Sequence, residues 1–313
     1  MSISWSIVIT TRDRAKMLQR AITSCVRQTF PCEVVVIDEA STDETRAVVD
    51  AFSTVRYFRN DVAIGHSAAA NMGIKSATGS WIKPLDDDDW LAPDCIEVMT
   101  RFLSNARAHG LSPTLLTGRV VNVDENEREL GRTRALSDIP VALRSRRLLE
   151  LMMRDQAPIG TPVQVGHSRD AALKSGGWNE HRRFSHQHGD ELELWIKLAA
   201  QGDAIFLPSF VAYRTIWPGG SQQRIPHQER YLSNLYIKDL IAEKLGEPTP
   251  QSIKSYLALH WALVAAKERS LSSAVRLGFE WIKRPASLVH LLNKRRLKDA
   301  SQFLEEVPND SAT

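Results

Sequence analysis

Short apolar runs alternate with amphipathic stretches along the first third of the chain. Residues 34–37 are wholly apolar, as expected of a parallel strand covered on both faces. Leu18, Ala21, Ile22 and Cys25 recur instead at helical spacing. The same criteria predict strands over 5–9, 33–37, 55–58 and 81–85, and helices over 15–28, 43–52, 67–77 and 93–108. This alternation predicts an α/β fold whose mostly parallel sheet is wound in one direction and flanked by helices.

The middle of the chain is less regular, and its end is helical. We expect strands over 114–123, 163–165, 204–207 and 210–213, a loop or hairpin over 124–138, and helical segments over 168–174, 190–201, 231–245, 253–267 and 271–282, with a last helix after Pro285. The pattern therefore divides the chain into an α/β unit over residues 1–222, with parts 1–123 and 124–222, and a helical extension over 223–313.

Polar clusters follow the predicted strands at 10–13, 38–39, 60–61 and 86–89. Sheets of this kind bind ligands outside the carboxyl ends of their strands, so these clusters should share one rim. The last cluster is four consecutive aspartates after an apolar strand. Crowded carboxylates repel unless a cation or a proton relieves them, and a hard divalent metal prefers their oxygens. The alternative is a solvated acidic turn that caps the helix beginning near Pro93.

Composition places few limits on function. The chain has 313 residues, 43% hydrophobic and 25% charged, which is ordinary globular usage. The net charge of +3 does not favour nucleic acid as a partner. Three scattered cysteines suggest reduced thiols, and no apolar run is long enough to span a membrane. We expect a cytoplasmic protein without a signal peptide, either free or peripheral at the inner face of the cell membrane.

Several segments together resemble glycosyltransferase family 2, which has the GT-A fold. Residues 6–14 are similar to the opening strand and loop of that family, and Leu85 to Trp90 is similar to its DXD segment. The other matching segments are Ala21 to Phe30, Val36 to Asp43, Asn60 to Gly65, Ala69 to Ile74, Ala77 to Gly79, Gly176 to Glu180 and Asp190 to Trp195. The resemblance covers residues 3–215 and implies an inverting transferase that takes a sugar from a nucleotide diphosphate sugar.

The resemblance also assigns roles to residues. It implies that the donor, of the uridine diphosphate type, is bound by Thr10, Arg12, Asp13, Asp38, Glu39, Asn71, Asp86 and Asp87. It implies that Asp88 binds Mg²⁺ or Mn²⁺, which would stabilise the departing diphosphate. Asp89 either holds the loop or caps the next helix. In this scheme, residues 1–123 bind the donor and residues 124–222 bind the acceptor.

The acceptor hydroxyl requires a general base, for which Asp190 and Glu191 are the candidates. Counting back from Trp195 favours Glu191, whereas the usual residue type favours Asp190, which is the preferred candidate. Trp178 and Trp217 are weaker candidates for contacts with a saccharide or lipid-linked acceptor, because an indole can stack on a sugar face.

Two departures from the family pattern, and the basic segment near the end of the chain, leave alternatives open. Ala70 stands where the family has Arg, and Trp217 stands where it often has His, so a catalytically degenerate protein that binds a nucleotide sugar or a partner is the alternative to an enzyme. Residues 281–298 carry six Lys and Arg and no acid among apolar residues. Such a helix either lies on an anionic membrane or packs on the protein with a basic outer face. The preferred function is glycosyl transfer in surface polysaccharide or glycolipid synthesis.

Overall fold

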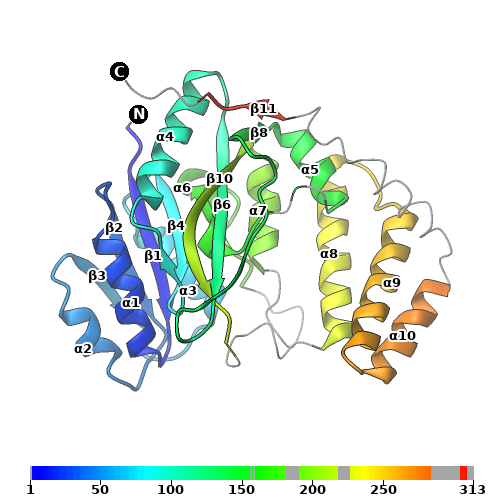
Figure 1. The fold of residues 1–313 in the computed structure, drawn as a ribbon, viewed down its shortest axis with the longest axis horizontal. Coiled ribbons are helices and arrows are strands. Elements are labelled where there is room, and N and C mark those ends of the chain that lie inside the picture. Colours follow the sequence, from blue (N-terminus) through cyan, green and yellow to red (C-terminus); the bar gives the residue numbers. More distant parts are fainter. Residues whose placement is uncertain are drawn as a thin grey trace.

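The fold is a large mixed sheet with helices on both faces and a group of three helices at one end (Figure 1). The computed structural model describes residues 2–155, 157, 159–180, 190–217, 226–282 and 304–308, and for Asp190 only its place in a helix. The helix expected after Pro285 and most of the basic segment 281–298 lie outside the described residues.

The first half follows the predicted alternation closely. Its elements are β1 (Trp5–Thr11), α1 (Ala15–Val26), β2 (Glu33–Asp38), α2 (Thr45–Asp50), β3 (Val55–Arg59), α3 (His66–Ser76), β4 (Trp81–Asp86), β5 (Trp90–Leu91) and α4 (Cys95–Ala108). β1 pairs in parallel with both β2 and β4, and β2 pairs in parallel with β3. The carboxyl ends of these strands therefore meet at one edge of the sheet.

The second half adds strands of both directions. Its elements are β6 (Pro113–Val123), β7 (Glu129–Arg132), β8 (Val141–Leu143), α5 (Ser145–Met153), the 3-10 turn η1 (Pro162–Gln164), β9 (Val165–Ser168), α6 (Arg169–Lys174), α7 (Asp190–Ala199), β10 (Asp203–Thr215), α8 (His227–Leu245), α9 (Gln251–Lys267), α10 (Leu271–Ile282) and β11 (Glu305–Glu306). The sheet order is β11-β8-β10-β6-β9-β4-β1-β2-β3, and β9 runs antiparallel to both of its neighbours.

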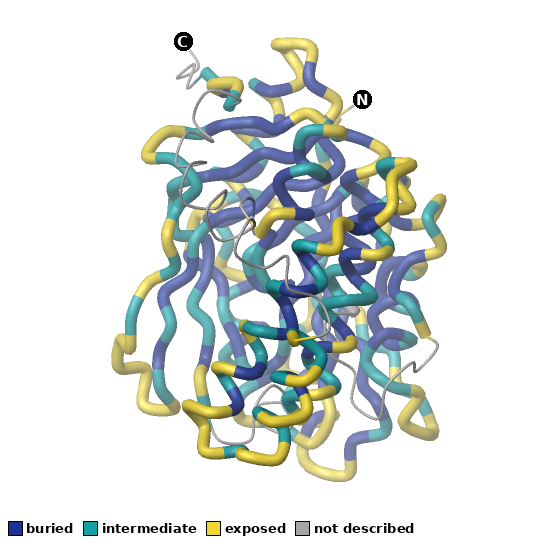
Figure 2. The backbone as a smooth tube through the Cα atoms, turned by 90° about the vertical axis from the view of Figure 1, so that its right-hand side faces the viewer, coloured by how far each residue is buried: buried dark blue, intermediate teal, exposed yellow. Residues whose placement is uncertain are grey.

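Alternate residues of the strands pack on opposite faces, as the two-residue repeat of a strand requires. Ile7 and Ile9 of β1 pack with α1 and α4, whereas Val8 packs on the other face with α3. Both layers are apolar and shielded from solvent. In Figure 2 the buried backbone, coloured dark blue, runs through the sheet. α8 packs against α5 and α7, and α9 and α10 continue this layer outward. The core thus fixes the strand ends, where the polar clusters lie.

A buried lysine joins the two halves of the sheet. The Lys83 side chain in β4 is fully buried, and its Nζ donates hydrogen bonds to the carbonyl oxygens of Pro84, Pro162 and Val163 at 2.8, 3.2 and 2.9 Å. Burial lowers the pKa of Lys83 to about 8. The three bonds satisfy every donor of the ammonium group and hold η1 against the strand that carries the aspartates.

Candidate active site

The four aspartates leave the end of β4 in different directions. Asp86 is half-buried, whereas Asp87 and Asp89 are buried at 2% and 4% exposure. Asp86, Asp88 and Asp89 each offer a carboxylate oxygen, and these oxygens lie within 4.8 Å of one another. Oxygen is the donor atom that Mg²⁺ and Mn²⁺ prefer, so this set fits a divalent cation of that kind.

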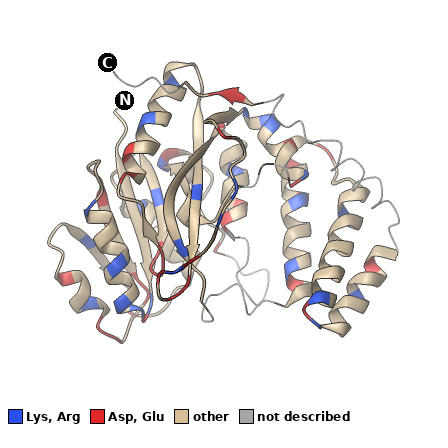
Figure 3. Ribbon diagram, in the orientation of Figure 1, with Lys and Arg blue, Asp and Glu red and all other residues tan. Residues whose placement is uncertain are grey.

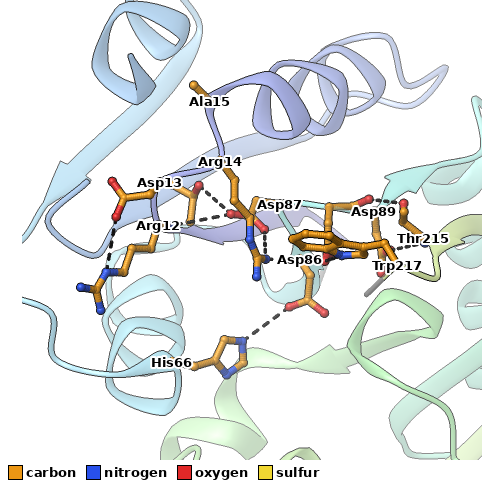
Figure 4. A network of polar contacts seen from close by, with 12 residues as sticks. Arg12, Asp13, Arg14, Ala15, His66, Asp86, Asp87, Asp89, Thr215 and Trp217 are labelled. Carbon is orange, nitrogen blue, oxygen red and sulfur yellow. Dashed lines mark hydrogen bonds and ion pairs between the residues drawn. The ribbon is translucent and has the colours of Figure 1, made fainter. Parts of the chain in front are cut away.

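Asp87 binds the neighbouring loop after β1. Its carboxylate accepts hydrogen bonds from Thr11 Oγ1 at 2.8 Å and from the Arg12 amide at 3.4 Å, and it forms an ion pair with Arg14 Nη1 at 2.7 Å (Figure 4). Because β1 and β4 are adjacent parallel strands, their ends are held side by side for these bonds. These contacts position the loop between β1 and α1.

Asp88 lies between a guanidinium and an indole. Its Oδ2 accepts a hydrogen bond from Trp217 Nε1 at 2.8 Å and lies 3.5 Å from Arg14 Nη1. The Arg14 guanidinium also lies over the Trp217 ring, 5.1 Å from its centroid. Trp217, at the position of the family's late His, therefore orients an acid of the candidate metal site through its N–H group.

The backbone beneath the acids is fixed by Arg20 and Thr215. Arg20 Nη2 donates to the Asp88 carbonyl oxygen at 2.7 Å and to Thr215 Oγ1 at 2.9 Å. The Thr215 amide donates to Asp89 Oδ1 at 2.8 Å. Arg20 also lies 3.8 Å from the centroid of the Trp90 ring, which stacks on Tyr213. These contacts favour the first of the two roles expected for Asp89, holding the loop, and they engage one of its two carboxylate oxygens.

Electrostatics distinguish the four carboxylates. Burial raises the pKa of Asp87 to about 6 against the influence of Arg14. Burial, and then the charge of Asp86, raise the pKa of Asp88; burial and the charges of Asp88 and Asp86 raise the pKa of Asp89 well above its ordinary value. Burial also acts on Asp86, but the hydrogen bond and charge of His66 outweigh it and lower the pKa of Asp86. A bound cation would relieve the mutual repulsion.

The loop after β2 presents a different acidic pair. Asp38 is 1% exposed; its Oδ1 accepts from the Ser41 amide at 2.9 Å, and its Oδ2 accepts from the Tyr57 hydroxyl and lies 3.5 Å from Arg59 Nε. Glu39 accepts a hydrogen bond from the Gly65 amide at 2.7 Å. Both oxygens of Asp38 are thus engaged within the protein.

The other donor-side candidates occupy distinct environments. Thr10 is nearly buried and pairs in register with Asp86. Arg12 is exposed and lies 3.7 Å from Asp13, whose carboxylate accepts the Thr42 amide at 2.6 Å. Of Thr10, Arg12 and Asp13, the side chains of Thr10 and Arg12 are therefore less engaged by hydrogen bonds within the loops than that of Asp13.

Asn71 ties α3 to the turn that precedes Trp178. Its Nδ2 donates to the Trp178 carbonyl oxygen and to Glu180, and its Oδ1 accepts from the Trp178 amide at 2.8 Å. Gly177 has φ +70°, and a Cβ there would lie 2.1 Å from Asn71 Oδ1, so only glycine fits this turn. Trp178 is 3% exposed and packs edge-on against His66 and Trp195. Its face is therefore covered by protein.

Helix α7 carries the candidate bases. Asp190 begins the helix, and Glu191 is half-buried at its second position. The charge of Glu191 acts on His66, which also contacts Asp86. Trp195, one turn further along α7, packs on Trp178 and so fixes this end of the helix beside the rim. Glu191 and Asp86 thus both act on His66.

The family is decided by two comparisons. A family model described as glycosyl transferase family 2 matches residues 6–172. The succinoglycan biosynthesis protein ExoO of Rhizobium meliloti is 33% identical over 303 residues, covering 91% of this chain and 83% of that protein. The chain belongs to glycosyltransferase family 2. It is therefore a transferase enzyme by family.

Other relatives and solved structures are similar over smaller parts or in fold alone. The Campylobacter jejuni GalNAc(5)-diNAcBac-PP-undecaprenol beta-1,3-glucosyltransferase is 30% identical over 110 residues, 33% of this chain and 36% of that protein. The crystal structure of S. aureus TarS 1-349 in complex with UDP-GlcNAc has a TM-score of 0.64 at 16% identity, over 90% of this chain and 79% of that one. This likeness confirms the expected GT-A architecture.

Within the part of the chain that the structure describes, no helix combines the length and hydropathy needed to cross a bilayer. Charge is mixed: Figure 3 shows Lys and Arg interspersed with Asp and Glu along α8 and around the sheet. The site residues that sequence reasoning missed are Arg14, Arg20, His66 and Thr215. Arg14 ends the matched segment 6–14 and His66 directly follows the matched Gly65, but their roles depend on contacts with strand ends far away in the sequence.

Proposed function

We propose that this family 2 enzyme is an inverting, metal-dependent glycosyltransferase that uses a uridine diphosphate sugar. The observation that carries the proposal is the set of three carboxylates from Asp86, Asp88 and Asp89 at the carboxyl end of β4. The mutual repulsion that helps to raise the pKa of Asp88 and Asp89, together with the closeness of the three carboxylates, suits a cation. TarS has been crystallised in complex with UDP and with UDP-GlcNAc, which supports a donor of this class.

The donor would lie along the rim formed by β2, β1 and β4. Thr10 and Arg12 are available to the nucleoside, while Asp13, Asp38, Glu39, Asn71 and Asp87 shape the loops around it. Asp86, Asp88 and Asp89 would hold Mg²⁺ or Mn²⁺, which as a Lewis acid offsets charge on a diphosphate leaving group. Arg14 and Trp217 keep Asp88 in place for that task.

Glu191 or Asp190 would act as the general base. The acceptor hydroxyl oxygen attacks the anomeric carbon as its proton passes to the carboxylate, and the bond from that carbon to the diphosphate oxygen breaks. One displacement inverts the anomeric configuration. Glu191 is supported by its half-buried position near His66 and Asp86. Asp190 retains its support from residue type alone.

The acceptor is a saccharide or a lipid-linked saccharide in surface polysaccharide synthesis. The names of two relatives, a succinoglycan biosynthesis protein and an undecaprenol-linked glucosyltransferase, support this setting. In this proposal, residues 1–123 bind the donor, residues 124–222 bind the acceptor with Trp178 and Trp217 near it, and residues 223–313 form the helical extension.

We further propose that the enzyme is cytoplasmic and touches the inner face of the membrane through this extension. Leu271, Val275, Phe279 and Ile282 project from α10 at intervals of four, four and three residues and are 57–73% exposed. Such a face suits a bilayer surface. Flotation with phosphatidylglycerol vesicles tests it: Phe279→Glu should abolish binding, with Leu130→Glu on β7 as the exposed control. Binding that is equal in wild type and Phe279→Glu would refute this contact.

Donor turnover tests the proposal as a whole. The protein is incubated with UDP-glucose, UDP-galactose and UDP-N-acetylglucosamine, with Mn²⁺ or with a chelator, and UDP release and the anomeric product are measured. We expect release only with metal and a product of inverted configuration. Tight donor binding without turnover, with any acceptor mixture, would instead favour the degenerate binder suggested by Ala70 and Trp217.

A further inference from the structure

His66 is the first residue of α3 and stands among acids from three separate segments. Its Nε2 lies 3.5 Å from Asp86 Oδ1 at the end of β4. Glu39, after β2, bonds the amide of Gly65, the residue just before it. The charges of Asp86, Glu191 and Glu39 all act on the imidazole. His66 thus occupies the point where the proposed metal site, nucleoside side and base face one another.

The ring is held in place but remains accessible. Trp178 packs edge-on against it, with ring centroids 5.2 Å apart and an interplanar angle of 83°. The His66 side chain nevertheless keeps 40% of its exposure, next to an Asp86 side chain that is 36% exposed. Figure 4 shows the imidazole on the opposite side of Asp86 from Arg14. A held, half-exposed ring with hydrogen-bonding nitrogens is suited to contacting a ligand from solvent.

The pocket beside the ring is small. A space of about 10 Å³, near the minimum that can hold one water molecule, lies between His66, Thr10, Ala70, Asp86 and Trp178. A sugar must therefore reach the imidazole at its exposed part, which lies next to the half-exposed Asp86 carboxylate. Carboxylates there disfavour a bare phosphate and favour hydroxyl groups, which can donate hydrogen bonds to them.

We infer that His66 is a donor-binding residue that hydrogen-bonds a hydroxyl of the transferred sugar, beside Asp86 and Trp178. The inference rests on the proposed function and deepens it, because it separates a sugar subsite from the diphosphate subsite. Asp86, Asp88 and Arg14 surround the diphosphate side, and His66 lies on the side toward α7. The nucleotide without its sugar would then make no contact with the imidazole.

The test compares two ligands on each protein. Calorimetry with Mn²⁺ measures the affinity for UDP and for the UDP-sugar, among UDP-glucose, UDP-galactose and UDP-N-acetylglucosamine, that wild type binds most tightly. His66→Phe keeps an aromatic ring against Trp178 but removes both nitrogens. We expect it to weaken UDP-sugar binding about tenfold and to change UDP binding less than twofold, since one hydrogen bond is lost.

Two further variants make the result decisive. His109→Phe places the same change on an exposed histidine just beyond the end of α4, at the other edge of the sheet, and should leave both affinities unchanged. His66→Gln restores a hydrogen-bonding group and should recover part of the lost UDP-sugar affinity. The ratio of the two affinities within one protein does not depend on the fraction that is folded, so a partly unfolded variant still reports it.

Every other outcome contradicts either the sugar contact of His66 or the proposed function. If His66→Phe binds the UDP-sugar as wild type does, the imidazole makes no contact with the sugar. If UDP and the UDP-sugar lose affinity equally, His66 acts through Asp86 on the metal or the diphosphate, and the sugar contact is refuted. If wild type binds neither ligand with Mn²⁺, the proposed function itself fails.

Discussion

Two acidic loops end neighbouring regions of the same sheet edge, and they use their carboxylates in opposite ways. After β2, Asp38 is surrounded by donors that engage both of its oxygens. After β4, Asp86, Asp88 and Asp89 turn their oxygens toward one another. Residue type and position after a strand are alike in the two loops. The arrangement of hydrogen-bond donors around each carboxylate therefore separates an acid that shapes a loop from one that is available to a cation.

The strongest test of this difference is Asp88→Asn. The amide keeps the shape and can still accept the Trp217 N–H, but it cannot serve as an anionic ligand. We expect turnover to fall about a thousandfold, a loss of roughly 4 kcal/mol in transition-state stabilisation. Calorimetry should show that Mn²⁺-dependent donor binding is lost while the melting temperature is kept. Donor and metal binding like those of wild type would remove Asp88 from the metal site.

A second test asks which acid on α7 completes the site. Asp190→Asn and Glu191→Gln remove one negative charge each from neighbouring positions. Turnover should fall about 10²- to 10⁴-fold in the variant that lacks the base and only slightly in the other. Both should bind donor with unchanged affinity, which calorimetry checks. Full turnover in both variants would place the base elsewhere.

The loop after β2 should respond in stability instead of metal binding. Asp38→Ala leaves the Ser41 amide and the Tyr57 hydroxyl without their acceptor in a buried place. Urea unfolding should show a loss of roughly 2–3 kcal/mol, as for hydrogen bonds to a buried charge. Mn²⁺ affinity should stay within twofold of the wild-type value. A variant that keeps its stability but loses metal would reverse the roles of the two loops.

The smallest effect concerns Asp89. Its folded pKa is raised well above the unfolded value near 3.8, so above that pH the unfolded state binds fewer protons than the folded state. The free energy of unfolding therefore falls as pH rises through this window. Asp89→Asn keeps an acceptor for the Thr215 amide and removes the charge. It should be about 1 kcal/mol more stable than wild type at pH 8, measured without metal.

That stabilisation should disappear near pH 4, where Asp89 is protonated in wild type as well. Added Mn²⁺ should stabilise wild type more than Asp89→Asn, because a ligand of the native state raises its stability. A variant that is less stable than wild type at pH 8 would show that the crowded acids do not oppose folding.

Much of the fold follows from periodicity. The strands and helices predicted over residues 5–108 begin and end within about two residues of their predicted bounds, because each carries a complete apolar stripe or run. β5, β8, β11 and the helix α5 were not predicted; the strands among them have two or three residues, too few to define a strand from sequence. β10 is one strand where two were expected; Pro208 lies at a register shift between Phe206 and Phe210, where the missing N–H is tolerated.

The site was predictable only in its acids. The cluster at 86–89 and the pair at 190–191 are visible as residue types in sequence. The different roles of these acids cannot be seen in the sequence, because they depend on hydrogen-bond donors such as Arg14, Thr215 and Trp217 from distant segments. Likewise, the burial of Trp178 follows from Asn71 and His66 on α3, and no local pattern around Trp178 indicates it.

The ammonium group of Lys83 offers a reporter of how this protein opens. An amine that is sealed between a strand and a turn cannot meet an acetylating reagent until one of them moves away, whereas lysines on the surface react at once. The rate at which mass spectrometry detects acetyl-Lys83 would therefore report how often η1 leaves β4 in the native enzyme, with or without nucleotide sugar.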